Sequence, residues 1–217
     1  MKKSFVVFAA VGLFALTAVA QDVPKVETFL GYTYVRANSA TDVPSFSANG
    51  GGGQFAYNFS KHFSAVADLG AVHNGNIGGH TIDTTLANFL FGPRFSLRYS
   101  RVRPYVQVLF GGVYATTSSS VIALVDPAIP INLPGYQNLV ATTPALQAIS
   151  ARVGAQQTAF AMTAGGGVDI KINKHVSFRP IGLDYYMTRL QNLRTAGDNN
   201  QDNLRYTTGF NFTFGAQ

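Results

Sequence analysis

The stretch Arg205-Tyr206-Thr207-Thr208-Gly209-Phe210-Asn211-Phe212-Thr213-Phe214 alternates between two kinds of residue along its whole length. The even positions are mostly aromatic, and the odd positions are polar or small. Successive side chains of a β-strand point to opposite faces, whereas neighbours on one face of a helix are three or four residues apart. The stretch therefore predicts a β-strand with one polar face and one bulky apolar face, the latter containing Tyr206, Phe210, Phe212 and Phe214.

The same period of two recurs along the chain. Between Thr85 and Tyr99 the odd positions are mainly aromatic or aliphatic, while the even positions include Asn88, Arg94 and Arg98. A helix would spread these two sets around its circumference. The pattern predicts eight strands, at about residues 26–36, 50–59, 63–73, 84–99, 103–115, 158–172, 176–189 and 204–214.

The connections between these segments alternate in length. The short ones cover residues 60–62, 100–102 and 173–175, and the long ones cover about 37–49, 74–83, 116–157 and 190–203. Strict alternation places every tight turn at one end of the sheet and every extended loop at the other, which is typical of transmembrane barrels. The sequence therefore predicts an all-β fold, an eight-stranded antiparallel up-and-down transmembrane β-barrel.

Periodicity alone leaves open which face of the barrel points outward. A soluble eight-stranded barrel of the lipocalin kind would place the apolar residues inside. Here the polar face contains several glycines beside its Arg and Asp residues, whereas the other face consists of large Phe, Tyr and Leu side chains. Because an eight-stranded interior is just wide enough for side chains to fill it, the smaller set fits inside and the bulky apolar set fits lipid. Tyrosines near segment ends are expected to form interfacial girdles, namely Tyr32, Tyr34, Tyr57, Tyr99, Tyr114 and Tyr206.

The composition is unusual for a protein dissolved in water. Charged residues make up 12% of the sequence, against roughly 25% in soluble domains. The absence of Cys excludes disulfides, thiolate metal sites and cysteine nucleophiles. Lys and Arg occur singly along the chain, so nucleic acid is not expected as a partner.

The N-terminus has the three parts of a secretory signal peptide. A cationic start precedes an almost unbroken apolar run at residues 4–16, and Ala18-Val19-Ala20 forms a cleavage site ahead of Gln21. The apolar run is short for a membrane-spanning helix of about 20 residues. We therefore expect residues 1–20 to be cleaved off and residues 21–217 to form one barrel domain. Loss of two lysines would lower the formal net charge from +6 to +4.

Four stretches carry a resemblance to a known family. They are Val26-Glu27-Thr28-Phe29-Leu30-Gly31-Tyr32-Thr33-Tyr34, Gly165-Gly166-Gly167-Val168-Asp169, the segment from Arg179-Pro180 to Asp184-Tyr185, and the closing strand quoted above. Over nearly all of residues 24–217 except the long loops, the chain resembles the OmpA-like eight-stranded outer-membrane β-barrel domain family. The resemblance implies a location in the outer membrane of a Gram-negative bacterium, with membrane lipid as a partner.

The same resemblance implies a partner during biogenesis. In this family the aromatic last strand is the signal read by the barrel-assembly machinery, which assigns that role to Tyr206, Phe210, Phe212 and Phe214. Gly215-Ala216-Gln217 follow the terminal phenylalanine and depart from that signal. No peptidoglycan-binding domain follows the barrel, so a role in cell-wall anchoring is not carried over.

The face assigned to the interior holds a balanced set of charges. Its acids are Glu27, Asp68, Asp169 and Asp184, its bases are Arg94, Arg98, Lys171 and Arg205, and Gln107 and Asn211 lie between them. A buried unpaired charge is strongly unfavourable, so we interpret this set as a neutral network that closes the lumen. The alternative is a narrow polar pathway for ions or small solutes, although aqueous channels are typical of barrels with 16 to 18 strands.

Other chemical signals are weak. The glycines at residues 50–53 and 165–167 are not followed by the Lys-Ser/Thr of a phosphate loop. His73, His80 and Asp83 share one predicted loop and could ligate a metal, but their spacing matches no established site. An enzyme acting on membrane lipid at the barrel rim would need a Ser/His/acid geometry that a sequence cannot show. The prediction is a non-catalytic surface scaffold without a cofactor.

The connection at residues 116–157 is long for a structureless loop. Within it Thr143 could cap a short helix with Pro144 at its first position, and Leu146, Ile149 and Val153 would then share one face. Such a stripe could cover the barrel mouth, lie on the lipid interface or bind a partner. The connection is therefore a candidate site for an extracellular ligand, and the alternative is a variable surface loop.

Overall fold

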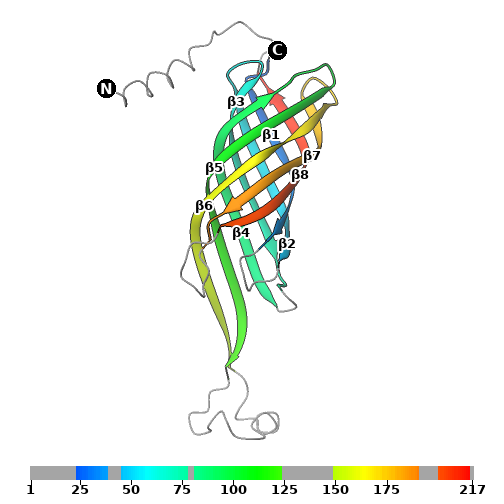
Figure 1. The fold of residues 1–217 in the computed structure, drawn as a ribbon. Helices are drawn as coiled ribbons and strands as arrows, with labels where there is room; N and C mark the ends of the chain where they lie inside the picture. The colour runs from blue at the N-terminus through cyan, green and yellow to red at the C-terminus, as the bar shows by residue number, and fades with distance from the viewer. Residues whose placement is uncertain (1–22, 39–44, 78–80, 124–148, 191–199, 216–217) are drawn as a thin grey trace, which may run out of the picture.

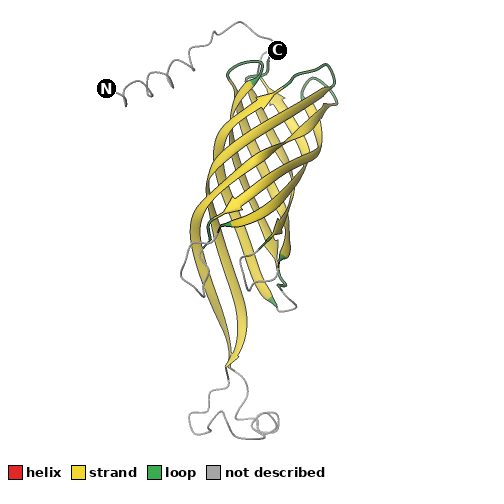
Figure 2. Ribbon diagram, viewed as in Figure 1, coloured by secondary structure: helices red, strands yellow, loops and turns green. Residues whose placement is uncertain are grey.

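The eight strands of the described residues form a closed barrel, in which each strand pairs antiparallel with the next and β8 closes on β1 (Figure 1). The computed structural model describes residues 23–38, 45–77, 81–123, 149–190 and 200–215. The strands are β1 (Val26–Ala37), β2 (Phe46–Asn58), β3 (Phe63–Asn74), β4 (Ile82–Ser96), β5 (Val102–Ala123), β6 (Ile149–Lys171), β7 (Val176–Thr188) and β8 (Gln201–Phe214). Figure 2 shows strands and loops throughout the described part of the chain. The predicted fold class is confirmed.

The two ends of the barrel differ in their connections. Residues 59–62, 97–101 and 172–175 form short turns at one end, here called the turn end, where β1 begins and β8 ends. The opposite end, the loop end, carries the longer connections. Among the described residues there is no helix with the length and apolar character needed to cross a bilayer. The predicted signal peptide and its cleavage site lie outside the described residues and stay a prediction.

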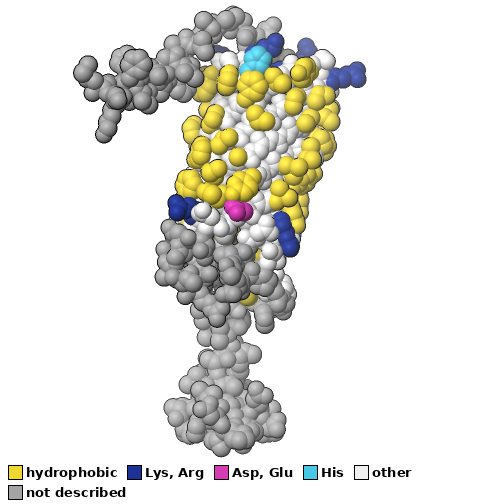
Figure 3. Space-filling model, viewed as in Figure 1, with side chains coloured by type: hydrophobic (Ala, Val, Ile, Leu, Met, Phe, Trp, Pro, Cys, Tyr) yellow, Lys and Arg dark blue, Asp and Glu magenta, His cyan; other side chains and the backbone are white. Residues whose placement is uncertain are grey.

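The outer wall of the barrel is apolar. Figure 3 shows hydrophobic side chains over the wall, with Lys and Arg side chains near its two edges. Large side chains on this wall are more than half exposed, among them Leu30, Phe55, Leu69, Phe91 and Val106. Exposure of so many large apolar groups is expected in lipid and not in water. The soluble, lipocalin-like alternative is therefore wrong.

Tyrosine hydroxyls mark the border of this wall at the loop end. Each bonds to a polar side chain of a neighbouring strand, so the ring contacts the apolar wall while the hydroxyl lies among polar groups. The pairs are Tyr32 with Asn49 at 2.5 Å, Tyr34 with Ser47 at 2.8 Å, Tyr114 with Gln156 at 2.8 Å, and Tyr185 with Asp202. Near the turn end, Tyr57 and Tyr99 are exposed.

Strands β5 and β6 are longer than predicted. The sequence suggested a connection at residues 116–157, but the paired strands continue to Ala123 and resume at Ile149, so the connection covers residues 124–148. Each further cross-strand pair satisfies backbone N–H and C=O groups of both segments. The period-two signal is weak here because Thr, Ser and Gln occur on both faces of this segment.

The predicted helix within this connection is wrong where it can be compared. Ile149 and Val153, assigned to one helix face, both lie in β6. Thr143, Pro144 and Leu146 lie outside the described residues. A single short helix is marginal in water, whereas pairing with β5 gives the residues after Ile149 a complete ladder of partners.

The ends of β5 and β6 project beyond the barrel. The pairing of β4 with β5 ends at Ile82↔Ser119, and the pairing of β6 with β7 ends at Ala161↔Thr188. Beyond these pairs β5 and β6 pair only with each other, as Figure 1 shows at the loop end. We call residues 120–123 with 149–160 the projecting ribbon.

Strand β7 carries a bulge within the wall. Its register with β8 shifts between Arg179 and Gly182, at Pro180. Proline has no N–H for the ladder and is tolerated in sheets at bulges. Two carbonyl groups at this bulge accept side-chain hydrogen bonds from β8: the Tyr206 hydroxyl donates to Pro180 O at 2.7 Å, and Thr208 Oγ1 donates to Arg179 O at 2.9 Å. The hydroxyl of Tyr206, which was predicted as a girdle residue, therefore donates a hydrogen bond to the bulge.

Removing the Tyr206 hydroxyl is expected to destabilise the barrel. In Tyr206→Phe the carbonyl of Pro180 loses a donor within the apolar wall, where water cannot replace it, so the free energy of unfolding should fall by about 1–3 kcal/mol. Reversible urea unfolding in lipid vesicles measures this loss. Tyr32→Phe is the matched control, because its hydroxyl bonds to Asn49 at an exposed position, and it should cost less than about 0.5 kcal/mol. Equal losses in the two variants would contradict this role.

The barrel interior contains an apolar cluster as well as charges. Its members lie mostly in the loop-side halves of their strands and include Val35, Ala48, Val72, Leu86, Leu109, Val113, Ala161 and Tyr186. The sequence predicted the smaller, charge-paired set for the interior, and this apolar cluster is an addition to that set. Side chains must fill the whole interior of a small barrel, and apolar groups can be buried there without partners.

Candidate functional site in the barrel interior

Polar side chains from all eight strands meet inside the barrel. The ones predicted from the sequence that are buried there are Glu27, Asp68, Arg94, Gln107, Asp169, Asp184, Arg205 and Asn211. Alternation within each strand turns these residues inward, and closure of the sheet brings strands that are far apart in the sequence to within hydrogen-bond distance. The result is one connected interior network.

Arg205 bridges two carboxylates at the centre of the network. Its Nη1 lies 3.0 Å from Asp68 Oδ1, and its Nη2 and Nε lie 2.8 Å and 3.1 Å from Asp184 Oδ2. The side chain of Arg205 is 2% exposed. A guanidinium presents several donors in a rigid fork, so a single arginine can neutralise and orient both acids.

Gln54 links this centre to the rest of the network. Its Nε2 donates to Asp68 Oδ2 at 2.7 Å, and its Oε1 accepts from Arg179 Nη1 at 2.9 Å and from Arg94. A side-chain amide has both donor and acceptor atoms, so the uncharged Gln54 can bind a carboxylate and two guanidinium groups at once. Gln54 was not predicted as a member of the network.

Arg179 is the most deeply buried base, and the sequence did not predict it. Its side chain is 0% exposed, and its Nε donates to Asp169 Oδ1 at 2.7 Å. The guanidinium carbon lies 4.1 Å from the ring centre of Phe29 and 4.4 Å from that of Tyr105. Arg179 is thus held by an ion pair and by cation–π contacts with two rings.

Arg94 lies over the Tyr105 ring as well, with 4.5 Å between the guanidinium carbon and the ring centre. It differs from the other buried arginines because its hydrogen-bond partners are amides: Nη2 donates to Gln107 Oε1 at 2.7 Å, and another bond reaches Gln54. Gln107 in turn donates to Asp184 Oδ1 at 3.3 Å. The charge of Arg94 is therefore connected to an acid through one intervening side chain.

Two glycines make room for this cluster. Gly167 of β6 and Gly182 of β7 are register partners. A Cβ on Gly167 would lie 2.8 Å from the Tyr105 hydroxyl oxygen, and one on Gly182 would lie 3.1 Å from the same atom. Either methyl would push Tyr105 away from the arginines. The glycine runs at residues 50–53 and 165–167 are thus parts of strands β2 and β6.

At the turn end, Glu27 binds two arginines. Its Oε1 lies 2.8 Å from Arg98 Nη2 and 2.9 Å from Arg103 Nη1. The same oxygen accepts from Asn58 at 2.9 Å, and Oε2 accepts from Asn211 at 3.2 Å. Arg98 was predicted for the network, whereas Arg103 was not, although it lies four residues before Gln107 and so shares its inward face.

Lys171, also predicted for the network, is exposed at the turn end. It lies on the same face of β6 as Asp169, but it is the last residue of the strand, so its long side chain reaches the barrel mouth. Its assignment to the buried interior is wrong. The acids that it was expected to balance are instead neutralised by Arg179 and Arg103.

The predicted metal site does not assemble among the described residues. His73 Nε2 lies 4.0 Å from Asp83 Oδ1 at the loop end, where both side chains are well exposed. His73 Nδ1 is also 3.1 Å from Thr85 Oγ1. His80 lies outside the described residues, and within them no group of three or more potential ligands is arranged to hold a metal.

The predicted lipid-facing residues of the last strand all lie on the outer face of β8. Phe210 and Phe214 are exposed, while Tyr206 and Phe212 are partly covered by neighbouring side chains. Phe210 packs against Phe178 of β7, with 5.3 Å between ring centres. Their recognition by the barrel-assembly machinery stays a prediction.

Comparisons with known proteins agree on one kind of barrel. The model of the outer membrane protein beta-barrel domain family matches residues 6–217. No curated protein matches the sequence. Among solved structures, Ail, the attachment invasion locus protein of Yersinia pestis, is similar to this chain with a TM-score of 0.57 and 12% sequence identity, and the match covers 88% of this chain and 99% of Ail.

Two further structures give the same result. Neisserial surface protein A matches with a TM-score of 0.57 and 12% identity over 88% of this chain and 97% of its own. Ail in complex with the heparin analogue sucrose octasulfate matches with a TM-score of 0.53 and 14% identity over 88% and 99%. At these identities the structures show a shared fold alone. The predicted family resemblance is confirmed by the family model, and the chain belongs to the outer membrane protein β-barrel domain family of Gram-negative bacteria.

Proposed function

We propose that the protein is a non-catalytic scaffold of the outer membrane, with a closed lumen and with its loop end presented to the exterior. The observation that carries the proposal is the connected network of buried charges across the barrel. Four buried acids, Glu27, Asp68, Asp169 and Asp184, are each paired with an arginine: Arg179 and Arg205 are fully buried, and Arg98 and Arg103 are partly buried at the turn end. Paired charges held by several hydrogen bonds are difficult to displace, because a group left alone would remain buried and unpaired.

Two layers of buried side chains favour a closed lumen rather than a narrow pore. Arg179 lies between the rings of Phe29 and Tyr105, which fills the turn-side half of the interior. The apolar cluster around Leu109 and Val113 fills the loop-side half. A path for hydrated ions would have to cross both layers, and barrels with this number of strands are generally filled by their side chains.

Planar-bilayer recording tests the closed lumen. Purified, refolded protein is expected to give no steady single-channel current, with a large porin as the control for successful insertion. Arg94→Ala is the matched variant, because it enlarges the interior without removing the direct partner of a carboxylate. A steady current in the wild-type protein that changes in this variant would contradict the proposal and favour a pore.

The loop end is the proposed surface for contacts with the surroundings. The projecting ribbon extends past the barrel and presents two strand edges that β4 and β7 leave unpaired. Ail, which shares the fold, has been solved in complex with a heparin analogue, so binding of an external ligand by a barrel of this type has a precedent. The ligand of this chain is not specified by its described residues.

The proposal excludes an enzyme acting on lipid at the rim. At the loop end, His73 contacts Asp83 and Thr85 at exposed positions. In an enzyme the Thr85 hydroxyl would be the nucleophile and His73 the base, and the hydroxyl lies 3.1 Å from His73 Nδ1. An exposed contact of this kind lacks the held geometry that catalysis needs. A modified lipid A species that appears on expression and disappears in His73→Ala would contradict this part of the proposal.

A further inference from the structure

The turn end of the barrel contains a pocket of about 150 Å³. It lies where the lumen opens between the short turns, on the side that faces the periplasm in outer-membrane barrels. Its lining comes from the residues before β1, the β4–β5 and β6–β7 turns, the starts of β5 and β7, and the ends of β6 and β8. A volume of this size has room for several water molecules, and so for a small anion.

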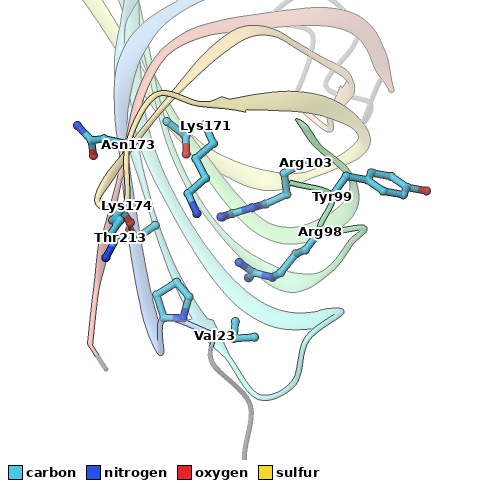
Figure 4. Close-up of a pocket in the computed structure, with 10 residues that line it drawn as sticks. Val23, Arg98, Tyr99, Arg103, Lys171, Asn173, Lys174 and Thr213 are labelled. Carbon is cyan, nitrogen blue, oxygen red and sulfur yellow. Dashed lines mark hydrogen bonds between the residues drawn. The ribbon is translucent and has the colours of Figure 1, made fainter. Parts of the chain in front are cut away.

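Four cationic residues line this pocket: Arg98, Arg103, Lys171 and Lys174. Figure 4 shows Arg98, Arg103 and Lys171 pointing toward one another across the pocket, while the Tyr99 ring points away. Ser177 and Thr213 contribute hydroxyl groups to the wall. Cations from separate elements that converge on one space repel one another, and an anion between them would remove that repulsion.

Within the part of the chain that the structure describes, the nearby carboxylates do not balance Arg98, Arg103 and Lys171. Glu27 accepts hydrogen bonds from Arg98, Arg103, Asn58 and Asn211, which occupy both of its oxygens. Asp169 is paired with the buried Arg179, which itself needs a negative partner. Among the described residues, one carboxylate therefore serves Arg98, Arg103 and Lys171, and these three side chains leave a positive excess at the mouth.

One donor in the pocket has no partner. Arg98 Nη1 is buried yet has no hydrogen-bond acceptor, although Nη2 of the same guanidinium binds Glu27. Lys171 also has no carboxylate within ion-pair distance among the described residues. A buried donor without an acceptor is unfavourable, and such atoms in native structures often mark the place of a bound ion or water.

We propose that this pocket binds a phosphate group from the periplasmic side. Arg98 and Arg103 would contribute guanidinium N–H donors, with the unpaired Nη1 of Arg98 among them, and Lys171 would add a mobile point charge. Phosphate suits this set because its oxygens accept several charge-assisted hydrogen bonds and its charge matches the positive excess better than a single carboxylate does. The phosphate belongs to a soluble phosphate compound or to the headgroup of a phospholipid in the inner leaflet.

Isothermal titration calorimetry with two probes separates these sources. The refolded full barrel, in a non-ionic detergent without phosphate groups, is titrated with inorganic phosphate and with dihexanoyl phosphatidylglycerol. Binding of inorganic phosphate with a Kd of about 1 mM or tighter supports a site for soluble phosphate. Binding of the lipid alone supports a site for a lipid headgroup. Binding of both probes supports a site that recognises the phosphate group in either compound.

Lys171→Gln is the main variant, because the side chain is exposed and its loss leaves no carboxylate unpaired. It should weaken binding by about tenfold, the effect of losing one charge-assisted contact. Lys61→Gln is the matched control: Lys61 is exposed in the β2–β3 turn at the same end but does not line the pocket. It removes the same charge and should change the Kd by less than about twofold.

Arg98→Lys adds an independent measurement. It keeps the charge beside Glu27 but removes the fork that carries the unpaired Nη1, so it too should weaken phosphate binding by about tenfold. The heat-dependent mobility shift on a detergent gel confirms that each variant is folded. The proposal is overturned if neither probe binds to the wild-type barrel, or if Lys61→Gln weakens binding as much as Lys171→Gln does.

Discussion

Replacing Arg205 with methionine is expected to lower the free energy of unfolding by about 3–5 kcal/mol, among the largest losses for any single substitution in this barrel. Arg205 binds Asp68 and Asp184 at 3.0 Å and 2.8 Å, and its side chain is 2% exposed. Methionine keeps much of the volume but leaves two carboxylates in the interior without their shared cation. The measurement is reversible urea unfolding in lipid vesicles, followed by the heat-dependent gel shift.

Two further variants separate charge from shape. The triple variant Arg205→Met, Asp68→Asn, Asp184→Asn removes the stranded charges and should recover more than half of the loss. Arg205→Lys keeps the charge but replaces the fork with a single ammonium, so it should fall between the wild type and Arg205→Met. If the triple variant is no more stable than Arg205→Met alone, the loss does not come from unpaired carboxylates.

Much of this network follows from alternation in the sequence. In β8, strict alternation assigns Arg205 and Asn211 to one face and Phe210 to the other, and the structure buries the first two and exposes the third. The same reasoning works in β4, where Arg94 is buried and Phe91 is exposed. A barrel wall separates lipid from the interior along its whole length, so one misplaced residue in a regular strand would put a charge in lipid.

The bulge in β7 explains why Arg179 escaped the same reasoning. Strict alternation places Arg179 and Asp184 on opposite faces, because an odd number of steps separates them. The register shift at Pro180 reverses the alternation, and both side chains face inward. Proline within a strand was the available signal, since it is confined to edges and bulges in sheets, and a barrel has no edge.

The misassigned loop residues have a different cause. Between Thr116 and Ala123, and again after Ile149, the segment carries Thr, Ser and Gln on both faces, so no contrast between lipid and interior marks its period. The structure pairs residues 120–123 and 149–160 with each other's strand, beyond the ends of the β4 and β7 ladders. Alternation of apolar and polar residues marks a strand only where its two faces differ in polarity. It therefore does not mark a ribbon with similar residues on both faces.

Arg179→Met is expected to lower the free energy of unfolding by about 3–5 kcal/mol, because it strands Asp169 in the interior. Arg179 Nε donates to Asp169 Oδ1 at 2.7 Å, and the amide of Asn211 donates to Oδ2 of the same carboxylate at 3.3 Å. The substitution also ends the cation–π contacts with Phe29 and Tyr105. Urea unfolding in the same vesicles gives the loss.

Arg94→Met is the matched control for this prediction, because Arg94 lies over the same Tyr105 ring at 4.5 Å but binds amides and no carboxylate. It removes an arginine from the same layer without stranding an acid, so its loss should be about 1–3 kcal/mol. Adding Asp169→Asn to Arg179→Met should bring that variant toward the Arg94→Met value. If the two single variants lose equal stability and the added substitution restores nothing, packing against Tyr105, and not neutralisation of Asp169, is the reason that Arg179 is buried.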